Sequence, residues 1–343
     1  MKRIVIDAFG GDFAPNETVM GALKALENHA DLSILLSGDQ KKIEAILQGQ
    51  SFDAKRLEIL PADEVIATEE EPVKAVRTKK NSSLVVALRA VADRRADVMV
   101  SAGSTGAVLA GAILCVGRIK GIKRPALAPM IPTVNGKFAM LLDCGANVDC
   151  KPSYLQQFAL MGSIYMQAVM GISAPRVGLL NNGAEAEKGN DLTKHTYPLL
   201  ETMPIAFAGN CEPRYMMSGD FDVIVADGFA GNVALKTLEG TAASVMKILK
   251  EALMSSARNK LGAALAKPAF ANVKKRMDYE KVGGAMLLGI DGGIIKAHGN
   301  AKANALAAAI EQGIHYIEGD VTEKIRNQMD AIQKQEEGAI HGE

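Results

Sequence analysis

The sequence predicts an α/β protein built on a mostly parallel sheet that helices cover on both faces. Two observations predict this class. Short β-branched or leucine-rich runs alternate with longer amphipathic stretches along the 343 residues, which is the order of parallel α/β proteins. The apolar runs also end repeatedly in glycine-rich turns that carry Asp, Asn, Ser or Lys. Because an open parallel sheet binds its ligand outside the carboxyl ends of its strands, we expect these turns to form one shared site.

The strands are predicted from the β-branched and leucine-rich runs that turn residues bound. They are expected at 3–8, 32–37, 57–61, 97–102, 125–133, 138–144, 176–181, 204–209, 221–227 and 286–297. The stretches between them are expected to be helical. Ser82 and Ser83 offer hydroxyl caps to one helix, and Pro152 and Gly171 are typical of the start and the end of another.

One segment departs from this alternation. Residues 241–283 have helical periodicity and no strand, which predicts a helical hairpin inserted between an α/β catalytic core at 1–240 and its return at 284–320. Residues 321–343 are expected to form a C-terminal surface helix and tail. The polar side of the hairpin is basic, with Lys247, Lys250, Arg258, Lys260, Lys267, Lys274, Lys275 and Arg276. We therefore expect a dimer arm, or contact with an anionic membrane surface or an acidic protein partner.

The composition restricts the class of protein and of partner. Hydrophobic residues make up 48% of the chain and charged residues 23%, which is typical of a globular protein with a substantial core. The 39 basic residues balance the 39 acidic ones, so overall charge does not favour nucleic acid as a partner. The four cysteines form no Cys-x-x-Cys pair, so neither a zinc site nor disulfides are expected. No signal peptide or apolar stretch of ~20 residues is visible, which favours a cytoplasmic location.

Several enzyme classes lose support because their motifs are absent. The sequence has no G-x-x-x-x-G-K-[ST] nucleotide loop, no G-x-G-x-x-G after a strand and no G-x-S-x-G elbow. Nucleotide hydrolysis and hydrolysis by a catalytic triad are therefore disfavoured. We interpret the glycine-rich turns as anion-binding loops instead.

These turns offer the hydroxyls and backbone amides that phosphate binding needs. Glycine allows an anion to approach the backbone closely, and the start of a helix presents unpaired N–H groups to it. The candidate phosphate- or substrate-binding residues are Asp7, Gly10, Gly11, Asp12, Ser101, Gly103, Ser104, Thr105, Gly106, Asp143, Asn147, His298 and Asn300. Taken alone, each turn equally fits an ordinary helix cap or tight turn, and His298 fits a structural hydrogen bond.

Lys188 and Asn232 are the sharpest side-chain candidates. Lys188 lies in NNGAEAEKGND, where flanking glycines can aim its ammonium at a bound anion or a developing oxyanion; the alternative is a solvated loop lysine. Asn232 lies in DGFAGN and offers an amide donor to a carbonyl or phosphate oxygen; the alternative is a helix cap. Cys144 follows a strand, where a thiol can form an acyl thioester, but an inert core residue is the better interpretation.

Taken in order, a set of motifs resembles the bacterial phosphate acyltransferase (PlsX) family over about residues 1–320. The motifs are DAFGGDFAP, EPVKAVRTKKNSS, SAGSTGA, LLDCGANVD, NNGAEAEKGN, DGFAGNVALK and AHGNAKA. Members of that family convert acyl-[acyl-carrier protein] and inorganic phosphate into acyl phosphate, which feeds phosphatidic acid and phospholipid synthesis. The resemblance implies a three-layer α/β/α sandwich like that of isocitrate and isopropylmalate dehydrogenases. It also implies a cytoplasmic homodimer with peripheral membrane contact, coupled in function to a membrane glycerol-3-phosphate acyltransferase.

The resemblance assigns roles to two residues. The family's lysine in an EGKGN-type motif falls on Lys188 and its asparagine in DGFxGN falls on Asn232, so these are the expected catalytic residues. The chain departs from the usual family motifs at four positions. It has Phe9 where Met is usual, Ser104 where Asn is usual, Cys144 where an aliphatic residue is usual, and Ala301 where Ser is usual. Because the family uses other residues at position 144, a thiol nucleophile becomes less expected still. The departure at 104 weakens the expectation that this side chain binds substrate.

The chemistry of the expected reaction agrees with these residues. A thioester is already activated, so phosphate can attack its carbonyl directly once the enzyme supplies positioning and charge neutralisation. We expect the glycine turns to hold phosphate while Lys188 and Asn232 stabilise the phosphate or the tetrahedral oxyanion. No cofactor, metal or covalent intermediate is expected. Two alternatives stay open: a phosphotransacetylase-like enzyme acting on acyl-CoA, and a non-catalytic anion-binding protein.

Overall fold

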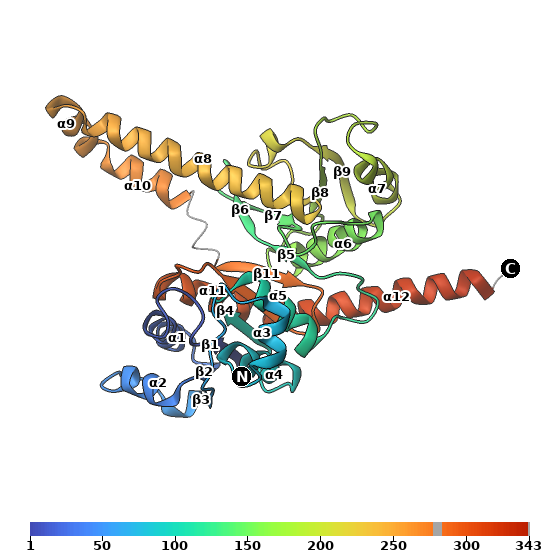
Figure 1. Cartoon of the computed structure of the whole chain (residues 1–343). Helices are drawn as coiled ribbons and strands as arrows, with labels where there is room; N and C mark the ends of the chain where they lie inside the picture. The colour runs from blue at the N-terminus through green and yellow to red at the C-terminus, as the bar shows by residue number, and fades with distance from the viewer. Residues whose placement is uncertain (277–282, 342–343) are drawn as a thin grey trace. The chain divides into compact units, whose positions relative to one another are not determined.

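In the computed structural model the chain divides into two compact units, each with its own sheet (Figure 1). The structure describes residues 1–276 and 283–341, except for the side chains of 274–276 and 335–341. Unit 1 comprises Met1–Pro129, Leu160–Ala174 and Glu280–Glu343, and unit 2 comprises Met130–Ala159 and Pro175–Tyr279.

Unit 1 is built on a seven-stranded sheet, counted over the described residues, with the order β3-β2-β1-β4-β12-β11-β5. Its strands are β1 (Lys2–Asp7), β2 (Leu32–Gly38), β3 (Leu57–Pro61), β4 (Val98–Ser101), β5 (Ala126–Ala128), β11 (Gly284–Leu288) and β12 (Gly293–Ala297). The first four and β12 run parallel, whereas β11 is antiparallel to both β12 and β5. The carboxyl ends of β1, β4 and β12 therefore lie side by side.

Helices cover both faces of this sheet because alternate strand residues point to opposite sides. The helices of unit 1 are α1 (Asn16–Asn28), α2 (Gln40–Leu47), α3 (Pro72–Thr78), α4 (Ser83–Ala92), α5 (Thr105–Gly111), α11 (Ala303–Glu318) and α12 (Val321–His341). Val5 and Met99 belong to the same core cluster as Leu88 of α4. Ile4 lies on the opposite face, where its side chain contacts the position of Gly313 in α11, and α1 packs against α11. Unit 1 is therefore a three-layer α/β/α sandwich.

Unit 2 is built on a five-stranded sheet, again counted over the described residues, with the order β6-β7-β10-β8-β9. Its strands are β6 (Met130–Pro132), β7 (Phe138–Leu142), β8 (Arg176–Leu180), β9 (Ala206–Cys211) and β10 (Val223–Val225). All neighbours are parallel except β6 and β7. The flanking helices are α6 (Pro152–Ala168), whose last residues belong to unit 1, α7 (Asp191–Glu201) and α8 (Gly228–Met254). Leu141 and Ile224 of the sheet form a core with Ala234 and Leu238, so the first half of α8 covers one face.

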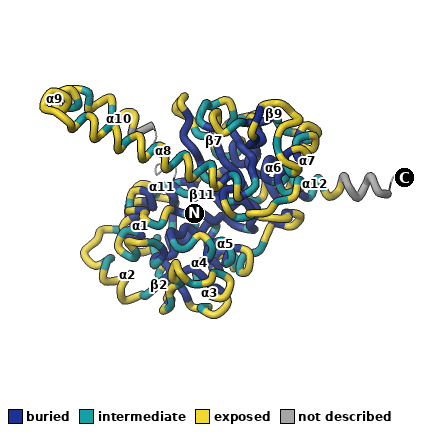
Figure 2. The backbone as a smooth tube through the Cα atoms, turned by 45° about the horizontal axis from the view of Figure 1, so that its top comes forward, coloured by how far each residue is buried: buried dark blue, intermediate teal, exposed yellow. Residues whose placement is uncertain are grey.

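The second half of α8 continues away from the sheet of unit 2 (Figure 1). It is followed by α9 (Ala257–Leu265) at the tip and by α10 (Lys267–Arg276), which runs back. This hairpin is mostly exposed (Figure 2), and Ile248, Leu261 and Leu265 are 65%, 66% and 78% exposed. Of the segment 241–283 in which the hairpin was predicted, residues 277–282 lie outside the described residues. Among the helices that the structure describes, none has both the length and the apolar character to cross a bilayer.

The α/β class with mostly parallel sheets is confirmed, but the strands form two sheets where one was predicted. The strand predicted at 125–133 is two short strands, β5 and β6, that belong to different sheets. Pro129 stands between them, and because proline has no N–H to donate, it interrupts a ladder of hydrogen bonds. The strand predicted at 286–297 is also two strands, β11 and β12, which pair antiparallel around a turn where Gly289 has φ +91°.

The predicted helix signals are confirmed where the structure tests them. The Ser82 hydroxyl accepts a hydrogen bond from the Val85 amide and caps α4, which is the role expected of a serine at that position. Helix α6 begins at Pro152. Gly171 has φ +68° three residues after that helix ends, a conformation that glycine adopts without strain.

Candidate functional site

Three glycine-rich turns meet at the carboxyl edge of the sheet in unit 1. They follow β1, β4 and β12, which are neighbours in the sheet. The Asp12 amide donates to the Gly299 carbonyl at 2.8 Å, which joins the first turn to the third. Gly11 has φ +104°, and a Cβ there would lie 2.9 Å from Ala102 Cβ and 3.0 Å from the Gly299 oxygen. Only glycine fits between the other two turns, so three of the predicted polar turns do come together.

Asp7 and Ser101 organise the turn that follows β4. The Ser101 hydroxyl donates to Asp7 Oδ2 at 2.7 Å and accepts from the Gly103 amide at 3.0 Å. A Cβ on Gly10 would lie 2.6 Å from the same carboxylate oxygen. Asp7 is 2% exposed, and its burial raises the pKa of the carboxyl, while hydrogen bonds from Ser83 and Ser101 act in the opposite direction. Asp7 and Ser101 therefore hold the backbone of the turn in place.

The other predicted residues of unit 1 lie nearer the surface of these turns. Ser104 stands at the start of α5, but its hydroxyl makes no capping hydrogen bond, so an ordinary serine cap does not describe this turn. A Cβ on Gly106 would lie 2.7 Å from Cγ of Pro72, which shows that this glycine lets α3 pack closely against α5. Four of the predicted residues in these turns are exposed: Asp12, Thr105, His298 and Asn300.

A second group of turns lies at the carboxyl edge of the sheet in unit 2, after the neighbouring strands β7, β10 and β8. Asp143 is fully buried, and its Oδ2 accepts from the Asn147 backbone amide at 2.6 Å and from Asn147 Nδ2 at 3.0 Å. The Asn147 carbonyl accepts from the Gly228 amide at 2.8 Å. A Cβ on Gly231 would lie 2.0 Å from the Asp143 carbonyl oxygen. Asp143 and Asn147 therefore hold the turn after β7 against the start of α8.

Asp227, and not Asn232, caps the N-terminus of α8. Its Oδ1 accepts a hydrogen bond from the Ala230 amide at 2.8 Å, as an N-cap carboxylate does. Asn232 lies in the following turn of the helix and is exposed. A Cβ on Gly145 would lie 3.8 Å from its Cγ. The helix-cap alternative for Asn232 is therefore excluded, and its amide stands beside the turn that follows β7.

Lys188 is exposed in the loop between β8 and α7. Its side chain lies over Gly183, where a Cβ would come within 2.8 Å of Lys188 Cγ. Gly189 has φ +104°, and a Cβ there would lie 2.0 Å from Thr193 Oγ1 and 2.5 Å from Asn181 Oδ1. The two flanking glycines thus do set the position of the lysine, one by leaving room for its stem and the other by its left-handed backbone.

Two buried asparagines that the sequence analysis did not single out hold this loop. Asn181 Nδ2 donates to the Lys188 carbonyl at 3.0 Å, and its Oδ1 accepts from the Asn182 amide at 2.9 Å. Asn210 Nδ2 donates to the Glu185 carbonyl at 2.7 Å. Asn181 follows β8 directly, and an amide side chain at a strand end is the signal that identified other candidates. Asn210 lies within β9 and had no such signal.

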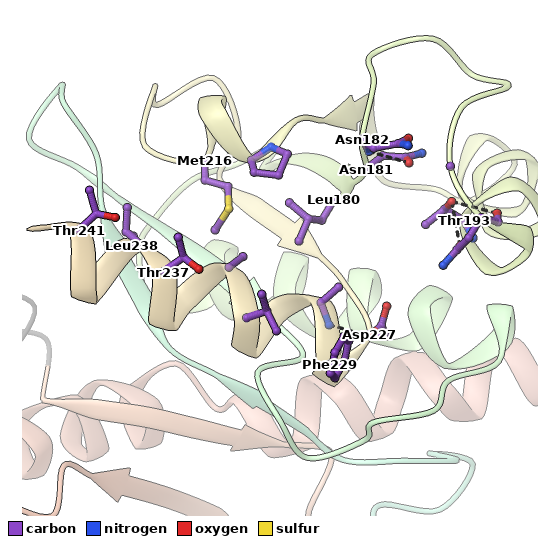
Figure 3. A pocket seen from close by; sticks show the side chains of 16 residues that line it. Leu180, Asn181, Asn182, Thr193, Met216, Asp227, Phe229, Thr237, Leu238 and Thr241 are labelled. Carbon is purple, nitrogen blue, oxygen red and sulfur yellow. Dashed lines mark hydrogen bonds between the residues drawn. The ribbon is translucent and has the colours of Figure 1, made fainter.

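A cavity of about 620 Å³ lies wholly within unit 2, between the first half of α8 and the turns after β8 and β9 (Figure 3). One end carries polar side chains from the Lys188 loop and the α8 cap. The rest is mainly apolar. The lining residues, grouped by element, are Leu180, Asn181, Asn182 and Gly189 at the end of β8 and in the loop after it; Asn190 and Thr193 at the start of α7; Pro213 and Met216 after β9; and Asp227, Phe229, Ala230, Val233, Ala234, Thr237, Leu238 and Thr241 in and before α8.

The cysteine thiols do not have the properties of a nucleophile. Cys144 is 4% exposed, and its thiol donates to the Leu141 carbonyl at 3.7 Å. Burial raises the pKa of the Cys144 thiol well above its usual range, with the nearby charge of Asp143 acting in the same direction. Burial likewise raises the pKa of Cys150 to about 11 and of Cys211 to about 12. Reactive thiols have lowered pKa values, so the core interpretation of Cys144 fits the structure better than a thioester-forming role.

Comparison with known proteins finds relatives along nearly the whole chain. The family model described as "Fatty acid synthesis protein" matches residues 2–324. A phosphate acyltransferase from Oceanobacillus iheyensis is 49% identical over 335 residues, which cover 98% of this chain and 99% of the relative. A phosphate acyltransferase from Clostridium tetani is 46% identical over 327 residues, which cover 95% and 98%.

Solved structures with the same fold include enzymes of phosphate and acyl-group chemistry. A phosphotransacetylase from Streptococcus pyogenes aligns with a TM-score of 0.59 at 16% identity, over 94% of each chain. The EutD phosphotransacetylase from Staphylococcus aureus aligns with a TM-score of 0.56 at 15% identity, over 93% of this chain and 94% of that one. At this level of identity the likeness establishes the fold and not the activity.

Proposed function

The chain belongs to the family described as fatty acid synthesis protein, and from this membership we propose that it is an acyltransferase that makes acyl phosphate. The acyl donor is an acyl-[acyl-carrier protein] and the acceptor is inorganic phosphate. The product serves phosphatidic acid and phospholipid synthesis. The relatives are named phosphate acyltransferases and align over nearly the whole chain, which supports acyl transfer to phosphate. Their names do not specify the acyl donor, so the carrier protein is proposed as the donor from the family resemblance.

The observation that carries the proposal is the placement of Lys188 and Asn232. Lys188 lies in the loop after β8, and Asn232 lies near the start of α8, the helix that follows β10. Because β8 and β10 are parallel neighbours in one sheet, both residues stand at the same edge. Both are exposed. The lysine is held by Gly183 and by the Asn181 hydrogen bond to its carbonyl. A cation and an amide donor on pre-shaped turns are what a developing oxyanion requires.

The proposed reaction is a direct displacement at the thioester carbonyl. A phosphate oxygen attacks the carbonyl carbon and forms the new C–O bond, the carbonyl oxygen becomes an oxyanion, and the C–S bond then breaks to release the carrier's thiolate. Lys188 neutralises charge on the phosphate or the oxyanion, and Asn232 donates a hydrogen bond to one of the same oxygens. Positioning and charge stabilisation of this kind supply most of the barrier reduction when the substrate is already activated.

We also propose that the three joined turns of unit 1 bind phosphate. Their bare glycine backbones support this role, since N–H groups in such turns bind anions. Asp7 is proposed to act there by shaping the turn through Ser101, because its carboxylate is buried and bonded to that hydroxyl. The side chains proposed to reach the anion are those of the half-buried Ser104 and of the exposed Thr105, His298 and Asn300.

One assay tests the proposed function. The purified chain is incubated with palmitoyl-[acyl-carrier protein], with and without inorganic phosphate, while free thiol is measured and acyl phosphate is trapped as hydroxamate. We expect thiol release and hydroxamate only when phosphate is present. Thiol release without phosphate would indicate a thioesterase, and no release with any acyl donor would favour the non-catalytic anion-binding protein.

The second candidate function is a phosphotransacetylase-like enzyme that uses acyl-CoA. The fold shared with phosphotransacetylases is compatible with it. The same assay run with palmitoyl-CoA separates the two candidates, because the proposed enzyme should have the higher kcat/KM with the carrier protein. A higher kcat/KM with acyl-CoA would favour the second candidate.

The partners and location are proposed from the hairpin and the family resemblance. We propose a cytoplasmic homodimer with peripheral contact to the inner face of the membrane, coupled in function to a glycerol-3-phosphate acyltransferase there. Exposed lysines on α8, such as Lys247 and Lys250, support contact with an acidic carrier protein or an anionic lipid surface. The side chains of Lys274, Lys275 and Arg276, which belong to the same basic group, lie outside the described residues.

The variant Lys247→Glu/Lys250→Glu tests the hairpin's role. We expect a higher KM for the acyl-[acyl-carrier protein] or weaker binding to anionic liposomes. If the variant kept both values at the wild-type level, neither interaction could be assigned to these lysines.

A further inference from the structure

One face of α8 lines the cavity of unit 2. Its residues recur three and four apart, so they lie on the same side of the helix. They are Ala230, Val233, Ala234, Thr237, Leu238 and Thr241. The opposite wall is formed by Leu180, Pro213 and Met216. Figure 3 shows these side chains arranged along the helix, with Thr241 and Leu238 at one end and Asp227 at the other. The cavity is therefore an elongated, mainly apolar space that follows the helix axis.

The polar end of this cavity lies at the loop that carries Lys188 and at the N-terminus of α8. Gly189 and Asn190, which line it, directly follow Lys188 in the chain. Asn232, at the start of the same helix, lies on the side of α8 opposite to the lining residues Ala230 and Val233, against the turn that follows β7. Asn181 lines the same end and holds the Lys188 carbonyl by a hydrogen bond. Leu238 and Thr241 lie at the other end of the cavity, farther along α8 than Asp227 (Figure 3).

We propose that this cavity binds the fatty acyl chain of the acyl donor, with the thioester at the polar end and the terminal methyl group toward Thr241. The proposal rests on the proposed function, because it assigns the donor's chain to a cavity that ends at the loop of the proposed catalytic residue Lys188. An apolar cavity with a few polar groups at one end is the usual form of a site for a ligand with one reactive head. Exposed Phe229 and Val233, 64% and 51% accessible, would be covered by the bound chain.

The length of the helical face sets the length of chain that the cavity accepts. The face from Ala230 to Thr241 spans eleven residues, or about 16 Å at 1.5 Å per residue. A staggered hydrocarbon chain with bonds of ~1.5 Å advances about 1.3 Å per carbon. The cavity therefore accommodates roughly twelve carbons beside the helix. Thr237 lies one turn before Thr241, which corresponds to about four fewer carbons.

Two substitutions place a bulky side chain at different depths. In Thr241→Trp the indole fills the far end, and in Thr237→Trp it fills the cavity one turn earlier. The matched control is Lys236→Trp, since Lys236 is exposed on the same helix and does not line the cavity. For each variant, kcat/KM is measured with octanoyl, dodecanoyl and palmitoyl thioesters of the carrier protein in the phosphate-dependent thiol assay.

The proposal predicts a graded change in chain-length preference. Thr241→Trp should lower the palmitoyl/octanoyl ratio of kcat/KM at least about tenfold, the effect of a misfit of one or more methylenes. Thr237→Trp should lower the dodecanoyl/octanoyl ratio as well, and Lys236→Trp should change neither ratio. An equal loss for all chain lengths, or unchanged ratios in both cavity variants, would overturn the proposal.

A binding measurement without catalysis separates this proposal from the proposed function. The probe is cis-parinaric acid, whose fluorescence rises when it enters an apolar site. Its Kd should rise at least about tenfold in Thr237→Trp and stay at the wild-type value in Lys236→Trp. Equal binding by wild type and Thr237→Trp contradicts the acyl cavity. Absence of phosphate-dependent thiol release from every donor by the wild type contradicts the proposed function instead.

Discussion

The side chain of Lys188 lies against the backbone of Gly183, five residues earlier in the same loop. A Cβ at position 183 would stand 2.8 Å from Lys188 Cγ and 3.3 Å from its Cβ, both closer than ordinary van der Waals contact. The position of the lysine therefore depends on the absence of a side chain at 183. This relationship can be tested without changing the lysine itself.

Gly183→Ala should displace Lys188 and reduce turnover. A misplacement of ~1 Å at a catalytic group can lower the rate by ~10²-fold. The phosphate-dependent thiol assay measures the effect, and circular dichroism checks that the fold is kept. Gly240→Ala is the matched control, because no atom lies within 4 Å of the position of its Cβ. That change should leave turnover unchanged and stabilise α8 by about 0.5–1 kcal/mol. Full activity in Gly183→Ala would disprove the positioning role.

Lys188→Ala and Asn232→Ala should each lower kcat by ~10²-fold or more, the usual cost of removing one donor to an oxyanion. Because both side chains are exposed, the thermal midpoint of unfolding should stay close to that of the wild type. Lys194→Ala is a control on the next helix, where another lysine is exposed. A Lys188→Ala enzyme that folds and turns over at a near-normal rate would rule out the proposed catalytic role of this lysine.

Cys144→Ala should retain turnover within about twofold of the wild type, because a buried thiol with a raised pKa is not a nucleophile. The substitution removes a packed core atom, so a loss of about 1 kcal/mol in the free energy of unfolding is expected. Steady-state kinetics and urea unfolding measure the two effects. Loss of turnover with the fold intact, together with a burst of thiol release in the wild type, would instead support an acyl-thioester intermediate.

Asp7 should make the stability of the protein depend on pH in a defined direction. Burial raises its folded-state pKa above the ordinary 3.8. Between the two values the folded protein binds more protons than the unfolded chain, so the free energy of unfolding falls as pH rises. The stabilising contribution of protonated Asp7 is complete below the unfolded pKa and is lost as pH passes the folded pKa.

Asp7→Asn removes this titration, and its free energy of unfolding relative to the wild type should therefore increase with pH. Urea unfolding at a series of pH values from about 4 upward measures the difference. Asp220→Asn, at an exposed aspartate, serves as the control and should show no such trend. A constant difference between Asp7→Asn and the wild type would show that burial does not raise the pKa of this carboxyl.

The errors of the sequence-based prediction come from pairing between distant residues. Most of the segment predicted as one strand at 125–133 is strand, yet Pro129 separates β5 from β6 and the two strands pair in different sheets. In the segment 286–297 the strands are interrupted at 289–292, where the chain turns at Gly289 and reverses to form an antiparallel pair. In both places the residue that breaks the strand was visible in the sequence. The sheet or the direction in which each resulting strand pairs depended on strands far along the chain.

The sequence by itself determined the α/β class, the glycine turns that end the strands, and the helix starts at Ser82 and Pro152. These features depend on a residue's own backbone preferences and on its close neighbours. Only the tertiary structure decided that the polar turns divide between two sheets, that Asp227 and not Asn232 caps α8, and that a cavity follows one face of that helix. Each of these features depends on which strands become neighbours and on which side chains come into contact in the folded chain. Such contacts are made between residues far apart in the sequence, and the conformational preferences of single residues do not predict them.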